Sequence, residues 1–156
     1  MVKSIIKNED YRLWVLMRLT RDAMAKSREK ELRRYGISSR ESAVLFIIQA
    51  VGDKPTPAEI SRWMFREQHS VSTLLNRMEK KGLIKKTKDL DRKNMVRVSL
   101  TDKGRQTFDK SSQTESIHRL LSVLSKKEYK QLFSILGILR DRALEDLAIE
   151  YKPPFP

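Results

Sequence analysis

The sequence predicts a mainly α-helical protein with one small β-hairpin, and three features carry that prediction. A serine or threonine stands three residues before a glutamate at Ser38, Thr56 and Ser125, which is the capping box that opens a helix. Apolar residues recur at helical spacing after these starts, and glycines stand where helices would end. Only the segment 83–100 alternates polar and apolar residues, as a strand with one buried face does.

The composition is that of a globular chain with a strong positive charge. Its 156 residues suit one domain with an extension, and 39% hydrophobic residues can form a real core. The net charge is +13, of which residues 62–105 contribute +8. Such a field favours polyanions but does not itself distinguish DNA, RNA and an acidic membrane. The absence of cysteine excludes disulfides and cysteine-ligated zinc.

Nothing in the chain predicts a membrane segment. No apolar run approaches the length that spans a bilayer, and the N-terminus lacks the apolar core of a signal peptide. We therefore expect a cytoplasmic protein with no membrane partner.

Residues 8–35 are expected to form one long helix, because they contain no proline or glycine and Gly36 can end it. Residues 11–17 are apolar over more than half of the helix circumference, whereas a helix on one core needs only a single stripe. The surplus predicts a subunit interface. Residues 26–34 are densely charged and are expected to be solvated. A nearly all-apolar helix from Ser39 to about Ala50 should lie at the centre of the core.

Two short helices follow, the first opening at the Thr56 cap and the second running from Gln68 to Lys81 before Gly82. The second helix has one apolar face, made of Val71, Leu74, Leu75 and Met78. Its other face carries the candidate base-reading residues His69, Ser72, Thr73, Asn76 and Arg77. Asparagine can pair with adenine and arginine with guanine. An ordinary polar surface would explain this helix about equally well when it is considered alone.

The hairpin favours the nucleic-acid interpretation. Strands 83–88 and 95–100 flank a polar loop with two cations, Arg92 and Lys93. A twisted ribbon can place Arg92 in a narrow minor groove, and Asp91 can hold that arginine extended. A solvated hairpin tip would explain the loop alone. The order of helix, helix, strand, basic loop and strand is more specific and predicts a winged helix-turn-helix over residues 36–101.

The C-terminal third predicts two more helices. One is capped by Thr101, begins polar and then turns apolar up to Leu124, and the next begins at Ser125. The main stripe of the last helix is Tyr129, Leu132, Phe133, Leu136, Leu139, Ala143 and Leu147. With residues 1–35, the segment 102–156 is expected to form a helical dimerisation region. The alternative is that these helices fold back onto their own chain. Residues 151–156 have the composition of a non-helical tail.

The chain resembles the MarR family of transcriptional regulators in three places. These are LLNRMEKKGLI at 74–84, the wing triplet Asp91-Arg92-Lys93, and VSLTDKG at 98–104. The family wing usually reads Asp-Arg-Arg, so Lys93 keeps the charge but loses the bidentate fork of arginine. The resemblance implies a winged helix-turn-helix that binds double-stranded DNA as a homodimer. It also implies a repressor released by a small aromatic or lipophilic effector bound between the dimerisation and reading domains.

A two-fold dimer would read a pseudo-palindromic operator whose half-sites lie on the order of 10 bp apart. The candidate phosphate contacts are Arg62, Arg66, Lys80, Lys85, Lys86 and Lys103. The candidate effector pocket consists of Trp14, Met17, Arg18, Phe46 and His118. Ordinary core packing is the simpler explanation of Trp14, Met17 and Phe46, and His118 is more simply explained as a structural or surface residue.

An enzyme is not expected, and neither a cofactor nor a metal is implied. The two histidines lie in different elements, and the chain has no glycine-rich phosphate loop and no nucleophile elbow. Two other functions remain as alternatives: an interaction module that binds protein or structured RNA, and a non-specific architectural DNA binder. The outer face of the helix from Gln68 carries no aromatic residue for stacking on single-stranded bases, which disfavours RNA.

Overall fold

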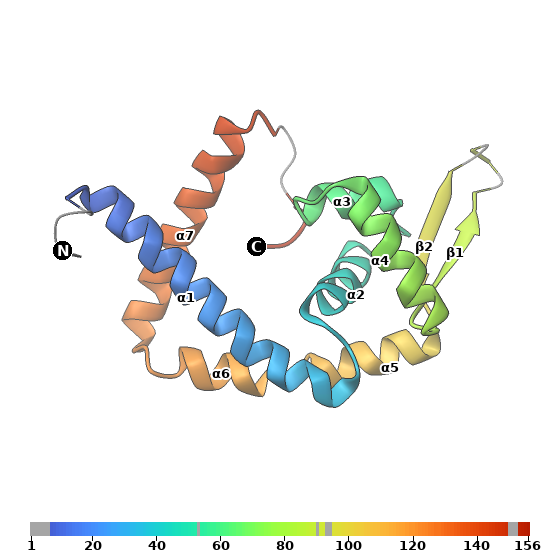
Figure 1. Cartoon of the computed structure of the whole chain (residues 1–156), viewed down its shortest axis with the longest axis horizontal. Coiled ribbons are helices and arrows are strands. Elements are labelled where there is room, and N and C mark those ends of the chain that lie inside the picture. The colour runs from blue at the N-terminus through green and yellow to red at the C-terminus, as the bar shows by residue number, and fades with distance from the viewer. Residues whose placement is uncertain (1–6, 53, 90, 93–94, 150–152) are drawn as a thin grey trace.

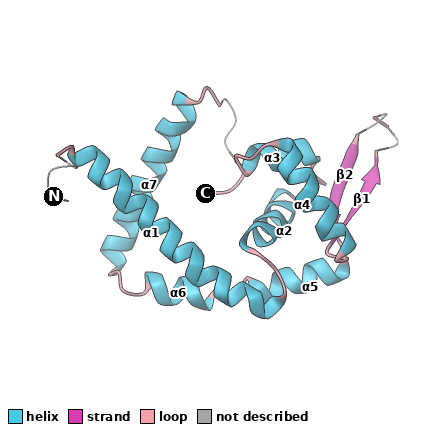
Figure 2. Cartoon of the chain, in the orientation of Figure 1, coloured by secondary structure: helices cyan, strands magenta, loops and turns pink. Residues whose placement is uncertain are grey.

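The computed structural model describes residues 7–52, 54–89, 91–92, 95–149 and 153–156. Its elements, in order, are α1 (Glu9–Leu32), the 3-10 turn η2 (Arg33–Tyr35), α2 (Ser39–Val51), α3 (Pro57–Trp63), α4 (Gln68–Lys80), β1 (Ile84–Lys88), β2 (Val96–Leu100), α5 (Asp102–Ser111), α6 (Glu115–Leu121) and α7 (Lys126–Asp146). In the part of the chain that the structure describes, the two strands form a single hairpin, so the prediction of a mainly helical fold with one wing is confirmed (Figure 2).

The helices and the hairpin divide into two groups (Figure 1). The head consists of α2, α3, α4 and the β1–β2 hairpin. The arm consists of α1, α6 and α7, with α6 packed on α1. The C-terminal end of α1 and helix α5 both pack on α2, and there the arm joins the head.

Local sequence signals start the helices where they were predicted. At α2, Ser38 Oγ accepts from the backbone N–H of Glu41 at 3.2 Å, and Glu41 Oε2 accepts from the N–H of Ser38 at 2.8 Å. The same reciprocal pair of bonds opens α3 and α7. These bonds satisfy donors that a helix start otherwise leaves without partners.

The hydrophobic core lies inside the head. Leu45 of α2, Ile60 of α3, Leu75 and Met78 of α4, and Val98 of β2 are all fully buried. The whole predicted apolar stripe of α4 is buried, so its opposite face is left to solvent. In α2 the prediction of a fully central helix was wrong for Phe46, which is 43% exposed.

The hairpin is fixed to the C-terminal end of α4. Its antiparallel register sets Ile84 opposite Leu100 and Lys88 opposite Val96. A Cβ atom at Gly104 would lie 1.9 Å from the carbonyl oxygen of Leu83, so only glycine lets the first turn of α5 approach this closely. The wing, α4 and α5 therefore form one packed unit.

The helix expected after Thr101 is interrupted, which corrects the prediction of one continuous helix. It ends at Ser111, and Thr114 takes a left-handed conformation with φ of 56° before α6 begins. The carboxylate of Glu31 accepts hydrogen bonds from the backbone N–H groups of Glu115 at 3.0 Å and Ser116 at 3.2 Å. A charged side chain of α1 therefore takes the place of a local cap and redirects the chain.

The expectation that the charged end of α1 is solvated holds for Lys26, Lys30, Arg33 and Arg34 but was wrong for Arg28 and Glu31. Glu31 is 6% exposed, and it binds the guanidinium of Arg28 at 2.6 Å. Arg28 also donates to the carbonyl oxygen of Ser111 at 2.6 Å. Burial would raise the pKa of Glu31, but the hydrogen bonds from Ser116 and Arg28 outweigh burial and lower the pKa to about 2. This buried ion pair joins α1 to both sides of the α5–α6 break.

The arm carries a large exposed apolar surface. On α1, Trp14 is 65% exposed, and on α7, Ile138 is 67% exposed. The predicted stripe of α7 is likewise uncovered at Tyr129, Leu132, Phe133, Leu136 and Leu139. The alternative of packing against the same chain therefore does not hold for this stripe of α7, whereas α6 does pack on α1 with its apolar residues half-buried. No helix among the described residues is long and apolar enough to cross a membrane.

Candidate nucleic-acid interface

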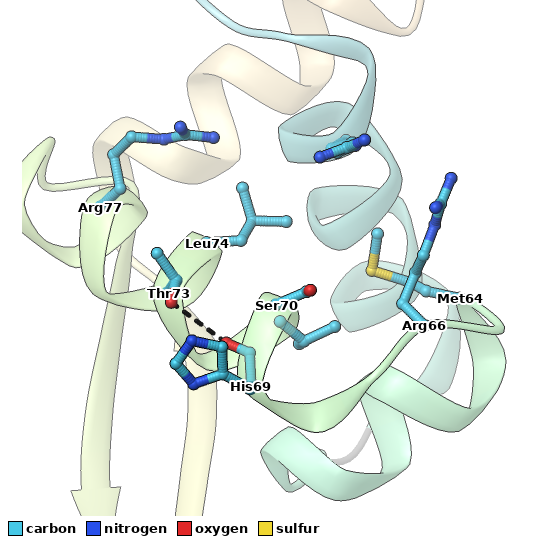
Figure 3. Close-up of a pocket in the computed structure, with 9 residues that line it drawn as sticks. Met64, Arg66, His69, Ser70, Thr73, Leu74 and Arg77 are labelled. Atoms are coloured by element: carbon cyan, nitrogen blue, oxygen red, sulfur yellow. Dashed lines mark hydrogen bonds between the residues drawn. The ribbon is translucent and has the colours of Figure 1, made fainter.

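The candidate base-reading residues share the outer face of α4. The predicted set His69, Ser72, Thr73, Asn76 and Arg77 is exposed, opposite the buried stripe. Thr73 Oγ1 donates to the carbonyl oxygen of His69 at 3.1 Å, which holds this hydroxyl against the helix (Figure 3). Helical spacing alone brings these side chains together, because positions three and four residues apart lie on one face.

A hollow of about 380 Å³ lies beside this face (Figure 3). Three arginines line it from three parts of the head: Arg40 from α2, Arg66 from the turn after α3, and Arg77 from α4. Among the described residues, no acidic side chain lines the hollow. Guanidinium groups bind phosphates well, so this concentration of charge suits a nucleic-acid backbone. Arg40 was missing from the predicted sites, because only the folded head places it near α4.

A buried carboxylate ties α2 to the C-terminal end of α4. Glu41 is 1% exposed, and its Oε1 lies 2.9 Å from Lys81 Nζ and 3.5 Å from Arg77 Nε. Burial would raise the pKa of Glu41, but the bonds from Lys81 and Ser38 lower it overall. The Arg77 side chain is 57% exposed, so its guanidinium faces solvent while its Nε atom contacts the buried carboxylate of Glu41.

Two of the lysines predicted to contact phosphates, Lys86 and Lys103, bind groups of α4 and its C-terminal cap in this structure. Lys86 Nζ donates to Asn76 Oδ1 and lies 3.4 Å from Glu79 Oε2. Lys103 Nζ donates to the carbonyl oxygen of Lys81 at 2.8 Å, where the last carbonyls of a helix attract cations. Asn76 must exchange its bond with Lys86 to contact adenine through both amide atoms. The remaining candidates, Arg62, Arg66, Lys80 and Lys85, are exposed.

Asp89 organises the base of the wing. Its Oδ2 accepts from Arg97 Nε at 3.2 Å, and its Oδ1 accepts from the backbone N–H of Asp91 at 3.1 Å. Both bonds lower the pKa of Asp89, and the bond from the backbone of Asp91 has the larger effect. Arg97 also donates to the carbonyl oxygen of Lys54 at 3.1 Å, which ties β2 to the start of the head. Arg92 is exposed at the tip, and Lys93 lies outside the described residues.

Comparisons with known proteins agree with this geometry. A model of the MarR family matches residues 35–93. The chain is 31% identical to the organohalide-sensing RdhR-CbdbA1625 transcriptional regulator in its 2,4-dichlorophenol-bound form, with a TM-score of 0.81. The match covers 89% of this chain and 83% of that one. The chain belongs to the MarR family.

Two further similarities span most of the chain. The chain is 25% identical over 146 residues to an HTH-type regulator named YfiV from Bacillus subtilis (strain 168), covering 92% of this chain and 90% of YfiV. A point mutant of E. coli MarR, solved with operator DNA, shares the fold with a TM-score of 0.79 at 21% identity. That match covers 87% of this chain and 99% of that one. This MarR-family protein is thus a DNA-binding transcriptional regulator and not an enzyme.

Of the predicted effector pocket, Phe46 lies on the head and the other members lie on the arm. Phe46 lines a hollow of about 300 Å³ on the head, together with Trp63, Met64 and Phe155. No other member of the predicted pocket lines that hollow. Trp14, Met17 and Arg18 lie on α1, and His118 lies on α6. Their joint role as an effector pocket stays a prediction.

Proposed function

We propose that this MarR-family protein is a homodimeric, sequence-specific repressor that reads a pseudo-palindromic operator. Residues 36–101 form its reading domain, and residues 1–35 and 102–156 form its dimerisation region. The observation that carries the proposal is the exposed face of α4, with its amide, hydroxyl and guanidinium groups, set beside a wing that presents Arg92.

The exposed surface of the arm supports the homodimer. A monomeric protein of this size exposes about 8,100 Å², whereas this chain exposes 12001 Å². The excess is larger than the roughly 800 Å² that each partner buries in a standard interface. Because its apolar part lies on α1 and α7, a second copy of the arm is the natural cover.

The charge distribution supports the DNA partner. Residues 62–105, which contain α4 and the wing, carry +8 of the total charge. In the proposed complex the phosphate candidates Arg62, Arg66, Lys80, Lys85, Lys86 and Lys103 position the dimer. The exposed side chains of α4 read base edges in the major groove, and Arg92, with Lys93 beside it and Asp91 orienting it, enters the minor groove.

Relief by a small aromatic compound is the regulatory part of the proposal. The dichlorophenol-bound relative supports it, because that regulator resembles this chain over most of its length. An effector releases DNA only if it binds better to a head spacing that the operator does not accept. The site proposed for it lies between the dimerisation region and the reading domain, with Trp14, Met17, Arg18, Phe46 and His118 as its candidate residues.

Selection of bound duplexes from a random DNA pool at about 0.15 M salt tests the proposal. We expect a palindrome with half-sites one helical turn apart. Recovery of no motif, with binding that vanishes as salt rises, would indicate a non-specific architectural binder. Stronger competition by structured RNA than by duplex DNA would indicate an RNA-binding module.

A further inference from the structure

The segment 153–156 lies against the head rather than along the arm. The ring of Phe155 stands 5.2 Å from that of Phe46 in α2, at an interplanar angle of 72°. It stands 6.4 Å from the ring of Trp63 at the end of α3, at 71°. Both are edge-to-face contacts within the favoured range of about 4.5–7 Å. The C-terminus accordingly lies beside the head in Figure 1, across a gap from α7.

The surface that receives Phe155 is an aromatic slot on the head. We define the slot as Phe46, Trp63 and Met64, which line one hollow of about 300 Å³ with Phe155. Phe46 is exposed on a helix whose other large apolar residues, Leu45, Ile47 and Ile48, are buried, and Phe155 packs against the core cluster beside it. Without Phe155 the slot would leave an aromatic patch open to water, next to the arginines that face the candidate DNA site.

The slot lies at a position that can influence DNA reading. Trp63 is the last residue of α3, and the turn after it leads directly into α4. Arg40 and Arg66 line both this hollow and the hollow beside the base-reading face. A side chain seated in the slot therefore contacts the same structural unit that positions α4.

We propose that Phe155 and the slot form an intramolecular clasp that holds the head to the end of the arm and thereby sets operator affinity. The inference rests on the proposed function as an operator-binding dimer. The head is already joined to the arm where α1 and α5 pack on α2. The clasp adds a second attachment, reached through the chain that follows α7. While Phe155 occupies the slot, the length of chain from Leu147 to Phe155 limits how far the head can move from the end of α7.

The clasp couples to DNA through head spacing. An operator accepts one distance between the two heads, so it binds the clasped and unclasped proteins with different affinity. By linkage, DNA binding must then shift the clasp equilibrium by the same factor. Locking the clasp and releasing it should therefore move operator affinity in opposite directions from the wild type.

Two variants test the clasp in the full-length chain. Phe155→Ala releases it, and Pro156→Ala, one residue along in an exposed position, is the matched control. The double variant Phe46→Cys with Phe155→Cys is joined by a short bismaleimide crosslinker to lock it. The natural chain has no cysteine, so the crosslinker has no other thiol to modify. The same double variant before crosslinking is its own unlocked control.

We expect the crosslinked double variant to run at the mass of one chain on a denaturing gel, because the crosslink lies within that chain. We also expect a red shift of tryptophan emission in Phe155→Ala but not in Pro156→Ala. Trp14 is common to both proteins, so the difference spectrum reports Trp63. Operator affinity should differ at least about threefold between the locked and released forms, with the wild type between them.

Three results would each overturn the clasp: crosslinks only between two chains, unchanged tryptophan emission in Phe155→Ala, or equal operator affinity of the locked and released forms. Failure of the proposed function gives a different result, because the wild-type protein would then select no operator. The gel and the emission spectra need no DNA, so they test whether Phe155 occupies the slot even if the protein selects no operator.

Discussion

At the residue scale, Phe65 adopts an unusual backbone conformation for a phenylalanine. It has φ of 51° in the turn between α3 and α4, and its ring is 56% exposed. Its N–H donates to the carbonyl oxygen of Arg62, and the N–H of Arg66 donates to that of Ser61, which closes a Schellman motif. Glycine is the residue that this position favours, because a Cβ atom is strained there.

We expect Phe65→Gly to raise the free energy of unfolding by about 0.5–1 kcal/mol, because relief of the strain exceeds the entropy cost of glycine. Phe65→Ala is the control, since it removes the exposed ring but keeps the Cβ atom. Urea denaturation measures both. An equal gain in the alanine variant would assign the effect to the ring instead of to the backbone.

Arg77 can contact either a base edge or a phosphate, and the Arg77→Ala variant distinguishes the two roles. We expect Arg77→Ala to weaken binding to the selected operator by roughly 1–3 kcal/mol if the guanidinium reads a guanine, and to change binding to random duplex much less. Lys85→Ala is the matched control, since an exposed phosphate contact should weaken both duplexes alike. Titration of each DNA with each variant measures the difference. Equal losses on the two duplexes for Arg77→Ala would make it a phosphate contact.

At the element scale, the wing is held at its base by Asp89 and Arg97 and presents Arg92 at its tip. We expect Arg92→Ala to weaken operator binding without changing the unfolding midpoint, because an exposed tip residue contributes to DNA contact and not to the core. Arg97→Ala should differ by lowering stability as well, since it removes the bond to Asp89. Operator affinity of Arg92→Ala equal to that of the wild type would refute the assignment of the wing.

The buried Glu31 gives the α5–α6 break a dependence on pH. Its pKa is lowered from 4.5 to about 2 in the folded protein, so its stabilising contribution is full above pH 4.5 and is lost as the pH falls toward 2. Glu31→Gln should lower the free energy of unfolding at pH 7 by roughly 1.5–3 kcal/mol, the range for hydrogen bonds to a charged group.

The difference in unfolding free energy between Glu31→Gln and the wild type should therefore shrink as the pH falls through that window. Glu29→Gln is the control, because Glu29 makes partly exposed ion pairs with Lys26 and Arg33 that contribute little. Denaturation at a series of pH values measures both variants. A difference that does not change between about pH 7 and about pH 2.5 would mean that the charge of Glu31 is not responsible.

These elements also show which features of the fold and of the site can be predicted from the sequence. Helix starts and the two faces of α4 depend on residues three or four positions apart, so their pattern was readable along the chain. The break before α6 depends on Glu31, which acts on Ser116 across 85 positions of sequence. The place of Arg40 and the contacts of Phe155 with α2 and α3 are likewise long-range. Such contacts leave no local pattern, because only the fold brings their residues together.

At the scale of the whole molecule, the uncovered stripe of α7 should decide the oligomeric state. Ile138 is 67% exposed in the single chain, although it lies in a helix whose apolar residues are too numerous for a solvated surface. If a second copy covers this stripe, a charge at Ile138 would be buried without a partner at the interface. Removing charge from water without compensation opposes association strongly.

We therefore expect Ile138→Glu to convert a dimer into a monomer while leaving the head folded. Lys130→Glu, at an exposed polar position in the first half of the same helix, is the control and should remain dimeric. Sedimentation gives the mass of each variant, and circular dichroism confirms that the head, whose core does not include α7, keeps its helices. Because two heads held at a fixed spacing bind a palindrome cooperatively, the monomeric variant should lose most of its operator affinity but retain salt-sensitive binding to any duplex. An Ile138→Glu protein that stays dimeric would place the interface elsewhere on the arm, and a wild-type protein that sediments as a monomer would remove the two-fold symmetry on which operator reading depends.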